Sequence, residues 1–422
     1  MTKLLRAQLD SLIGADIDQL CADRAAEGTE LEFKSDLPSK AGRGTDPWHG
    51  GGGIGDYARN EIAQEIIAFA NTFGGVVCVG IDETADHPKR AQAPRPIPRV
   101  HDLARRLRQA VHDVIDPPLP VLEAIGVECG PVPGAGVVVL RVPPSRRRPH
   151  RHHVNKEVFV RRADESARIP MREIQELTIQ AVSEIGRVDS VIRESRDRFL
   201  SQTIGFLAAE RQPGEPPWGG AVHFVGVPTT PIDLGRVAGR RELVDMVPKV
   251  TAHFAGREIP CKWTYRPDQW KPALRSVHAE VRTAMGRDIR YGLQTNGVCE
   301  TSFRFRLSDT FPGISVSWLL GGLGFMLAWI EKIRAGGGGA TEYAVAPEFF
   351  LQVRPVLLLE YGVENYAEAL GTELPVGTHE FPVASIGPPD EFGRHLQRFD
   401  EDIWNLAGED IQRDAPTFSI AL

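Results

Sequence analysis

The stretch EIAQEIIAFANTFGGVVCVGIDE, residues 61–83, decides the fold of the first half of the chain. One set of apolar residues recurs at helical spacing and predicts the buried stripe of a helix: Ile62, Ile66, Phe69 and Phe73. Asn71 and the glycine pair that follows it are residue types that tolerate the left-handed conformation in which helices end. The uninterrupted apolar run of residues 76–81 predicts a strand that is covered on both faces. The stretch therefore predicts a helix, a sharp break and a buried strand that ends at Asp82.

The composition is that of an ordinary globular protein. The chain has 422 residues, of which 42% are hydrophobic and 25% charged, and this length suggests two or three domains. The five cysteines are scattered and lack a CxxC spacing, so neither a disulfide framework nor a zinc ribbon is expected, and a reducing cytoplasm fits best. The N-terminus has acids within its first twenty residues and no long apolar core, so we expect no signal peptide.

One segment is long enough and apolar enough to suggest a membrane span. Residues 310–330 carry no charge. However, they include Pro312 and four glycines, and the sequence GISVSW is typical of a strand. We therefore expect a buried strand followed by a buried helix, and no membrane association.

The predicted fold class is α+β, with two domains. The boundary comes from the proline- and glycine-rich sequence RQPGEPPWGG, residues 211–220. Four segments are expected: an N-terminal helical segment (1–26), an α+β domain (27–185), a linker (186–220) and a second α+β domain (221–422). In the first half we expect helices over 100–115 and 169–182, and strands over 122–128, 137–142 and 157–161. In the second half we expect strands near 221–227, 261–265, 301–307 and 313–318, and helices over 319–334, 348–359 and 393–406.

Three acids of the first domain form a candidate site. Glu27 precedes a predicted strand, Glu32 lies on the open face of that strand, and Asp82 ends the buried strand. If the two strands are neighbours, the three carboxylates meet at one rim, where a proton or a divalent cation must relieve their repulsion. Mg²⁺ or Mn²⁺ held there would activate water for hydrolysis of a phosphate ester, and Lys34 would steady the developing charge. The alternative is that these acids are simply solvated.

A strongly basic stretch covers residues 141–172. It has ten Arg or Lys against three Asp or Glu, which gives +7, whereas the whole chain has a net charge of −7 and the remainder therefore sums to −14. Such local charge suits a phosphate backbone. The candidate contacts are Arg146, Arg147, Arg148, His150, Arg161 and Arg162. The alternative is a solvated loop in a chain that favours arginine over lysine, 40 to 9.

A glycine-rich loop, residues 38–57, contains the run GGGGIG. This length suggests a mobile or functional loop. The run lacks the Lys-Ser/Thr pair with which a phosphate loop contacts nucleotide and metal, so nucleotide binding is disfavoured.

Four motifs resemble, in order, those of the Schlafen-type AlbA-like domain: EGTELEFK, EIIAFANTFGGVVCVGIDE, VVVLRVPPSRRRPH and VFVRRADESARIP. The resemblance covers about Glu27–Val182, and AFANTFGG is its most specific element. It implies an α+β domain that associates with nucleic acid. In some members this domain is a metal-dependent ribonuclease with three acids as its site.

Carried over by motif, the three acids are Glu27, Glu32 and Asp82, which would hold Mg²⁺ or Mn²⁺. Lys34 is the lysine of the EFK motif, and Arg161 is the arginine of the last motif. Two features depart from the family. The glycine-rich loop is unusual, and a single domain lacks the paired lobes that clamp RNA in animal Schlafens. No helicase motor is evident in the second half.

Four hypotheses remain open from the sequence. The first is a nucleic-acid-binding Schlafen-type protein, with metal-dependent endoribonuclease activity in stress or phage defence. The second is a non-catalytic DNA-binding regulator whose C-terminal half senses a ligand or dimerises. The third is a nuclease of the Asp…Glu-x-Lys type built on Glu32 and Lys34, and the fourth is an ATP-binding module. The expected partners are RNA or DNA, and a second copy of the chain if the C-terminal half dimerises.

Overall fold

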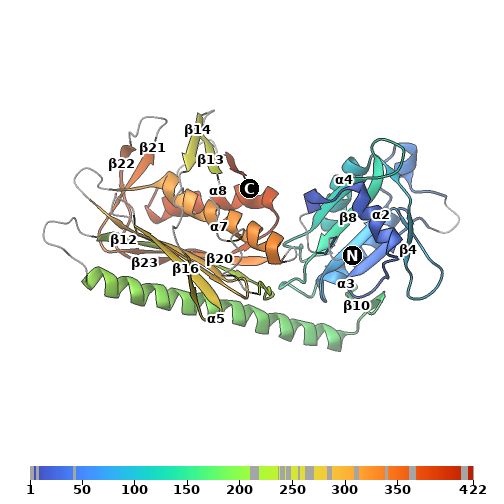
Figure 1. Ribbon diagram of the computed structural model, residues 1–422, viewed down its shortest axis with the longest axis horizontal. Helices are drawn as coiled ribbons and strands as arrows, with labels where there is room; N and C mark the ends of the chain where they lie inside the picture. Colours follow the sequence, from blue (N-terminus) through green and yellow to red (C-terminus); the bar gives the residue numbers. More distant parts are fainter. Residues whose placement is uncertain are drawn as a thin grey trace. The chain divides into compact units, whose positions relative to one another are not determined.

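The structure is a computed structural model of the chain. It describes the following residues: 4–5, 9–40, 44–209, 218–235, 237, 243, 249–254, 257–261, 270–282, 288–307, 313–337, 341–360, 367–409 and 417–421. The chain divides into two compact units (Figure 1). Unit 1 is Met1–Gly186 with Gly338–Glu342, and unit 2 is Arg187–Gly337 with Tyr343–Leu422.

Unit 1 is an α+β unit built on a five-stranded sheet. Its elements are η1 (Leu9–Ser11), α2 (Gly14–Ala22), β1 (Leu31–Lys34), η2 (Pro47–Gly50), α3 (Asp56–Ala70), β2 (Gly75–Val79), β3 (Ile81–Glu83), β4 (Ala91–Pro94), β5 (Ile97–Pro98), α4 (Val100–His112), β6 (Ile115–Asp116), β7 (Glu123–Glu128), β8 (Ala135–Val142), β9 (Arg151–His152), β10 (Phe159–Arg162), β11 (Glu165–Arg168) and the first part of α5 (Met171–Ala209). The strand order is β1-β2-β8-β5, with β7 also paired to β8. β1 runs parallel to β2, and β8 runs antiparallel to it.

The central strand β2 is covered on both faces, as its unbroken apolar sequence predicts. Successive side chains of a strand point to opposite faces. Val77 and Val79 accordingly pack in a core with residues of α3 and α4, whereas Val76 and Cys78 pack in a second core with residues of α2. The prediction of a buried strand is confirmed.

The break between α3 and β2 depends on Asn71 and Gly74. The helix ends at Ala70, and the buried Asn71 side chain donates to the carbonyls of His150 and Phe159, which ties three segments together. Gly74 has φ +75°, and a Cβ there would lie 2.7 Å from Pro144 Cδ. Only glycine fits both requirements. Phe73 was expected in the helical stripe, which is wrong, because it follows the helix and is 66% exposed.

Most of the other elements expected in the first half are present. α4, β7, β8 and β10 match the predicted helix 100–115 and the predicted strands. The helix 169–182 was predicted too short, because α5 continues to Ala209 and no proline interrupts it. The segment 186–220, expected as a linker, contains the second part of α5 and the start of the first strand of unit 2. Its residues Val188 and Ile192 are buried against that unit's sheet.

The glycine-rich loop is anchored by a tryptophan. Trp48 is fully buried, its indole N–H donates to the Pro98 carbonyl at 2.8 Å, and the Arg99 guanidinium lies 3.7 Å from its ring centroid. Asp46 accepts hydrogen bonds from the backbone N–H groups of Trp48 and Gly55. The described part of the loop is therefore held at its centre.

Unit 2 is an α+β unit built on an eight-stranded antiparallel sheet. Its elements are the second part of α5, β12 (Trp218–Pro228), β13 (Lys249–Phe254), β14 (Arg257–Cys261), β15 (Lys271–Ala273), β16 (Ser276–Arg282), β17 (Asp288–Gln294), β18 (Cys299–Arg306), β19 (Gly313–Ser315), α7 (Val316–Gly337), β20 (Tyr343–Leu351), β21 (Val356–Glu360), β22 (Ala367–Glu373), β23 (Gly377–Glu380), β24 (Ala384–Ile386), η4 (Pro389–Glu391), α8 (Phe392–Leu406) and β25 (Thr417–Ala421). The strand order is β15-β16-β17-β18-β12-β20-β23, with β24 also paired to β20.

One face of this sheet packs on α7 and α8. Trp329 of α7 and Phe399 of α8 lie in the same core as Phe224 of β12 and Phe349 of β20. α7 is long and apolar enough to cross a membrane by length and composition alone, yet 94% of its most apolar window is buried inside the protein. Such burial is also what the core helix of a soluble protein shows. The expected buried strand and helix are present as β19 and α7.

The second half contains one wrong prediction and one that lies partly outside the described residues. Residues 348–359 were expected as a helix but form the end of β20 and most of β21. β20 is buried on both faces, since Val345 and Phe349 lie in one core and Ala344 and Ala346 in another, and a short buried run has no period that separates strand from helix. Of the expected strand 261–265, only Cys261 lies within the described residues, as the end of β14.

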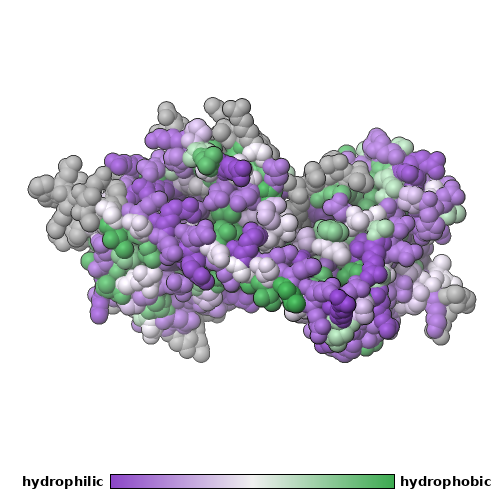
Figure 2. Space-filling model, turned by 90° about the horizontal axis from the view of Figure 1, so that it is seen from below, coloured by the Kyte–Doolittle hydropathy of each residue, from purple (hydrophilic) through white to green (hydrophobic). Residues whose placement is uncertain are grey.

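The face drawn in Figure 2 is mostly hydrophilic, with hydrophobic residues in small separate patches. Several exposed apolar side chains lie on α5: Met171, Ile179, Val182 and Ile204. Scattered apolar residues of this kind are normal on a protein surface.

Candidate functional site

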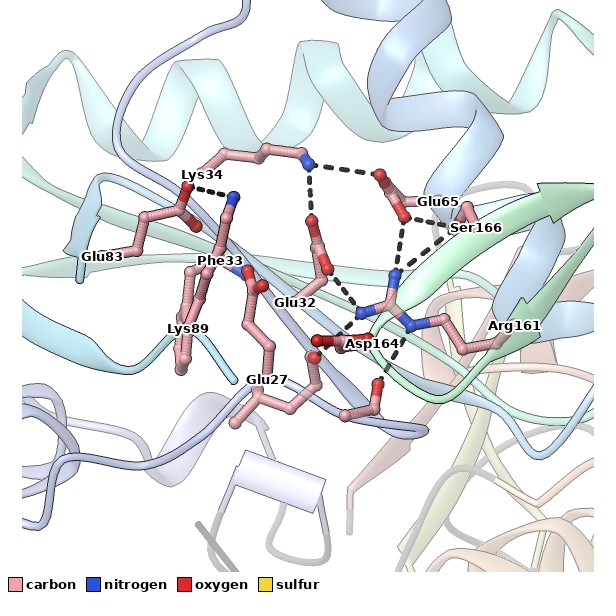
Figure 3. A network of polar contacts seen from close by, with 12 residues as sticks. Glu27, Glu32, Phe33, Lys34, Glu65, Glu83, Lys89, Arg161, Asp164 and Ser166 are labelled. Carbon is pink, nitrogen blue, oxygen red and sulfur yellow. Dashed lines mark hydrogen bonds and ion pairs between the residues drawn. The ribbon is translucent and has the colours of Figure 1, made fainter. Parts of the chain in front are cut away.

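A buried arginine joins three elements of unit 1. The Arg161 side chain, from β10, is 0% exposed. Its guanidinium lies 2.5 Å from the carboxylate of Glu32 on β1 and 3.0 Å from that of Glu65 on α3 (Figure 3). It also donates to the carbonyls of Gly28 and Leu31. Arg161 therefore fixes β1, α3 and β10 to one another.

Lys34 bridges the same two acids from the other side. Its ammonium lies 2.5 Å from Glu32 and 3.2 Å from Glu65. Burial opposes the ammonium, but the charges of Glu65 and Glu32 outweigh it and raise the pKa of Lys34. Glu32 was expected on an open strand face. The structure shows it only 4% exposed, with one carboxylate oxygen on Lys34 and the other on Arg161.

Glu27 lies next to this pair and is held in its protonated form. It is 6% exposed, and its carboxyl accepts a hydrogen bond from the Phe33 backbone N–H at 3.0 Å. Burial, then the charge of Glu32, raise the pKa of Glu27 to about 8, and the neighbouring Glu83 adds to the effect. At neutral pH Glu27 therefore carries a proton and no charge.

The acid that reaches this cluster from β3 is Glu83 and not Asp82. The carboxylate of Glu83 raises the pKa of Glu27, and Lys89 lies 2.5 Å from Glu83. The Asp82 side chain is 42% exposed and pairs loosely with Arg95 at 3.7 Å. The two residues are successive along one strand, and a bulge between them shifts the register. The expectation that Glu27, Glu32 and Asp82 meet at one rim therefore holds for the two glutamates only.

We name these charged residues the Glu32 cluster: Glu27, Glu32, Glu65, Glu83, Lys34, Lys89 and Arg161. Each of its three cations lies within ion-pair distance of at least one of its acids. Among the residues that the structure describes, no group of three His, Cys, Asp or Glu is arranged to hold a metal ion. Since Lys34 and Arg161 occupy both oxygens of Glu32, the donor set as it stands does not fit Mg²⁺ or Mn²⁺.

Sequence reasoning missed Glu65 and Ser166. Ser166, on β11, donates to Glu65 and lies opposite Arg161 in the hairpin. Glu65 precedes Phe69 by four residues, so it lies on the same side of α3 as the buried stripe. A charged residue on a buried stripe is the signal that points to an internal partner.

Residues 27–170 match the family described as Schlafen, AlbA_2. This region is a Schlafen/AlbA_2 domain. The resemblance seen in its four motifs is thus confirmed. The solution structure of the N-terminal domain of a RecG-related protein from Nitrosomonas europaea is similar at 19% identity and a TM-score of 0.25, over 37% of this chain and 92% of that one. The search of curated proteins found no match.

The basic stretch of the AlbA_2 domain and of the residues after it is largely paired with acids. Eight of its ten cations form ion pairs: Arg141, Arg146, Arg148, Arg151, Arg161, Arg162, Arg168 and Arg172. No ion pair of Arg147 or Lys156 is found in the part of the chain that the structure describes. The local charge of +7 is therefore offset by acids from elsewhere in the sequence, which composition alone does not show.

The residues predicted to contact phosphate differ in how far their side chains are exposed to solvent. Arg147 is exposed, and the Arg162 side chain is 56% exposed with Glu173 as its partner. Arg146 pairs with the buried Glu342, and Arg148 pairs with Glu184 at 2.6 Å. Arg161 is enclosed in the Glu32 cluster.

His150 lies in the interior of the AlbA_2 domain. Its side chain is buried, Nδ1 hydrogen-bonds the Pro117 carbonyl at 2.6 Å, and its backbone N–H donates to Asn71. Burial lowers its pKa to about 4, so the imidazole is neutral at neutral pH. The expectation that His150 contacts a phosphate does not fit this placement.

Proposed function

We propose that this protein binds nucleic acid through its AlbA_2 domain. The proposed contacts are three exposed arginines: Arg147, in the segment before β9, and Arg162 and Arg168, in the β10–β11 hairpin. What supports the proposal is the family match over residues 27–170 together with these exposed cations. Arg161 and His150 are buried, so in this proposal they support the fold of the domain and do not contact the nucleic acid.

The ion pairs of the exposed arginines do not prevent phosphate binding. The Arg162 and Arg168 side chains are 56% and 69% exposed, and an exposed ion pair contributes only about 0–1 kcal/mol. A phosphate therefore displaces Glu173 or Glu157 at little cost. Arg146 and Arg148 differ, because their side chains are only 15% and 10% exposed.

The test is a salt titration of affinity. In the triple variant Arg147→Ala, Arg162→Ala, Arg168→Ala, three lost phosphate contacts should make the slope of log affinity against log salt shallower by about 2 to 3. The same assay is run with a labelled RNA hairpin and a labelled DNA duplex. Arg354→Ala, at an exposed arginine of unit 2, is the matched control and should leave the slope unchanged. An unchanged slope in the triple variant would remove this surface from the proposal.

A second candidate is a metal-dependent ribonuclease centred on Glu27, Glu32 and Lys34, with Asp82 as the third acid. What favours it is that burial and the charge of Glu32 raise the pKa of Glu27 to about 8, since a divalent cation can replace a proton between carboxylates. One oxygen of Glu83, beside Glu27, is also buried without a hydrogen-bond partner among the described residues. Against it stand the two cations on Glu32 and the separate position of Asp82. Incubating labelled RNA with manganese or with chelator separates the two candidates.

A further inference from the structure

Unit 2 contains a cavity of about 640 Å³ between its sheet and α5. Its floor is the polar face of β16, β17 and β18, and its wall is one turn of α5 that carries Arg198, Phe199 and Gln202. In Figure 1, α5 runs beside the sheet of unit 2, next to the labelled strands β12 and β16. The volume lies in the range of small-molecule sites, which is roughly 300–1,000 Å³.

The contact between α5 and this sheet changes character along the helix. At its first part, Val188 and Ile192 pack on Val225, Val227 and other apolar residues. Two turns later the helix presents Arg198 and Gln202 to a polar floor, and the two surfaces separate around the cavity.

A glycine lies at the centre of the floor. On β17 the side chains of Arg290 and Gln294 point to the cavity, and Gly292 between them has none. A Cβ built on Gly292 meets only Glu300 Cβ, at 3.9 Å. Glycine inside a strand weakens it and often marks close approach of a ligand. Glycine therefore weakens β17 at a position where a side chain would project into the cavity.

A buried histidine, His223, also lines the cavity. His223, on β12, is 2% exposed and stacks on Phe199 with ring centroids 4.6 Å apart. Its Nε2 lies 3.4 Å from the Ser195 hydroxyl, a long hydrogen bond, and 3.8 Å from Glu300, whereas its Nδ1 lies 3.8 Å from Glu348 and has no hydrogen-bond partner among the described residues. A buried nitrogen without a hydrogen-bond partner is unfavourable, and a ligand that reached Nδ1 would supply the missing partner.

The charged groups of the cavity offer donors and acceptors side by side. Arg290 lies 2.8 Å from Glu280 and donates to Gln202, and Arg198 lies 3.2 Å from Glu300. Each guanidinium has five N–H donors, so these contacts leave donors for an anionic group. The carboxylates, together with the hydroxyls of Ser276 and Ser302, are acceptors for the hydroxyls of a ligand.

We propose that this cavity binds a phosphate ester of a hydroxylated sugar, such as a mononucleotide or a sugar phosphate. Arg198 and Arg290 hold the phosphate, and Glu280 and Glu300 accept hydrogen bonds from the sugar hydroxyls. The site is independent of nucleic-acid binding by the AlbA_2 domain.

The experiment is calorimetric titration of the full chain with adenosine monophosphate, ribose 5-phosphate and inorganic phosphate. The two esters should bind, and phosphate alone should bind more weakly. Gly292→Leu should abolish binding of both esters, because its side chain fills the cavity. Gly186→Leu, at an exposed glycine of α5 with no neighbour within 4 Å of an added Cβ, should bind as the parent does.

Two further variants keep the test decisive. Arg290→Gln does not fill the cavity and should weaken binding of the esters, even if Gly292→Leu fails to fold. Arg147→Ala should leave ester binding unchanged, which separates the cavity from the AlbA_2 surface. Absence of binding by all three probes, or equal binding of phosphate and the esters, would overturn the proposal. Unchanged binding by a folded Gly292→Leu variant would also overturn it.

Discussion

The two units each contain a buried charge cluster, and the two clusters are built differently. In the Glu32 cluster, Arg161 and Lys34 contact two acids at 2.5–3.2 Å. In unit 2, His223 lies 3.8 Å from both Glu300 and Glu348, and both oxygens of Glu348 lack a hydrogen-bond partner among the described residues. The first cluster is closed and the second opens on a cavity.

Buried charge alone therefore does not identify a functional site. Both clusters contain buried acids and both raise pKa values, so both meet the usual signs of function. In the Glu32 cluster each charge already has a partner, so its main effect is to join β1, α3 and β10. In unit 2, Nδ1 of His223 and both oxygens of Glu348 lack hydrogen-bond partners among the described residues, and space for a ligand lies beside His223.

The largest effect is expected at Arg161. Arg161→Met leaves Glu32 and Glu65 buried with Lys34 as their only cation in the described cluster, and should lower the free energy of unfolding by about 3–5 kcal/mol. Arg162→Met is the matched control one residue away, with an exposed partner, and should cost at most about 1 kcal/mol. Urea unfolding of both variants measures the difference. Equal costs would mean that the Glu32 cluster is not a closed structural network.

A smaller effect is expected at His223. Removing the imidazole in His223→Gln should cost about 1–3 kcal/mol, because its one hydrogen bond, to Ser195, is long at 3.4 Å and its two carboxylate neighbours lie 3.8 Å away. Burial opposes the imidazolium, but Glu300 and Glu348 outweigh it and raise the pKa of His223. Because the folded pKa lies above the unfolded value of about 6.5, protonation of His223 stabilises the folded protein fully below about pH 6.5. This contribution is lost as the pH rises through the folded pKa.

The measurement for His223 is urea unfolding at several pH values. The gap between the parent and His223→Gln should be largest in acid and should shrink as the pH rises. A gap that widens with pH would show that the buried histidine is neutral in the folded protein.

The third effect is a dependence of stability on pH that comes from Glu27. Its folded pKa of about 8 exceeds the unfolded value of 4.5, so between these values the folded state binds more protons than the unfolded state. Stability therefore falls as the pH rises through this window, by at most about 1.4 kcal/mol per pH unit from this group. Glu27→Gln should flatten the dependence between pH 5 and 8, and Glu30→Gln, at an exposed acid, should not. Identical slopes in the parent and Glu27→Gln would mean that Glu27 is charged.

Local sequence rules predicted the core of the AlbA_2 domain well. The helix, the break at Asn71 and Gly74, and the buried strand β2 all follow from residues within one short stretch. The family motifs then placed Glu27 and Glu32 close together. These features depend on short-range spacing, which a single sequence contains.

Features that depend on distant pairing were not predictable. The acids that neutralise the basic stretch come from positions as distant as Asp116 and Glu342, and their partners are set by the fold. The choice of Glu83 over Asp82 depends on a bulge, which no residue in that strand signals. The error at residues 348–359 arose because a central strand buried on both faces has no distinguishing period.

The most direct test of the account is one assay that measures binding and cleavage together. A labelled RNA hairpin is incubated with the parent and with Glu32→Gln, in manganese and in chelator, and the RNA is examined both for retention on the protein and for length. The account predicts that the parent retains the RNA and leaves it intact in both conditions, because Lys34 and Arg161 occupy the oxygens of Glu32. Manganese-dependent cleavage by the parent, absent from a folded Glu32→Gln variant that still retains RNA, would contradict it.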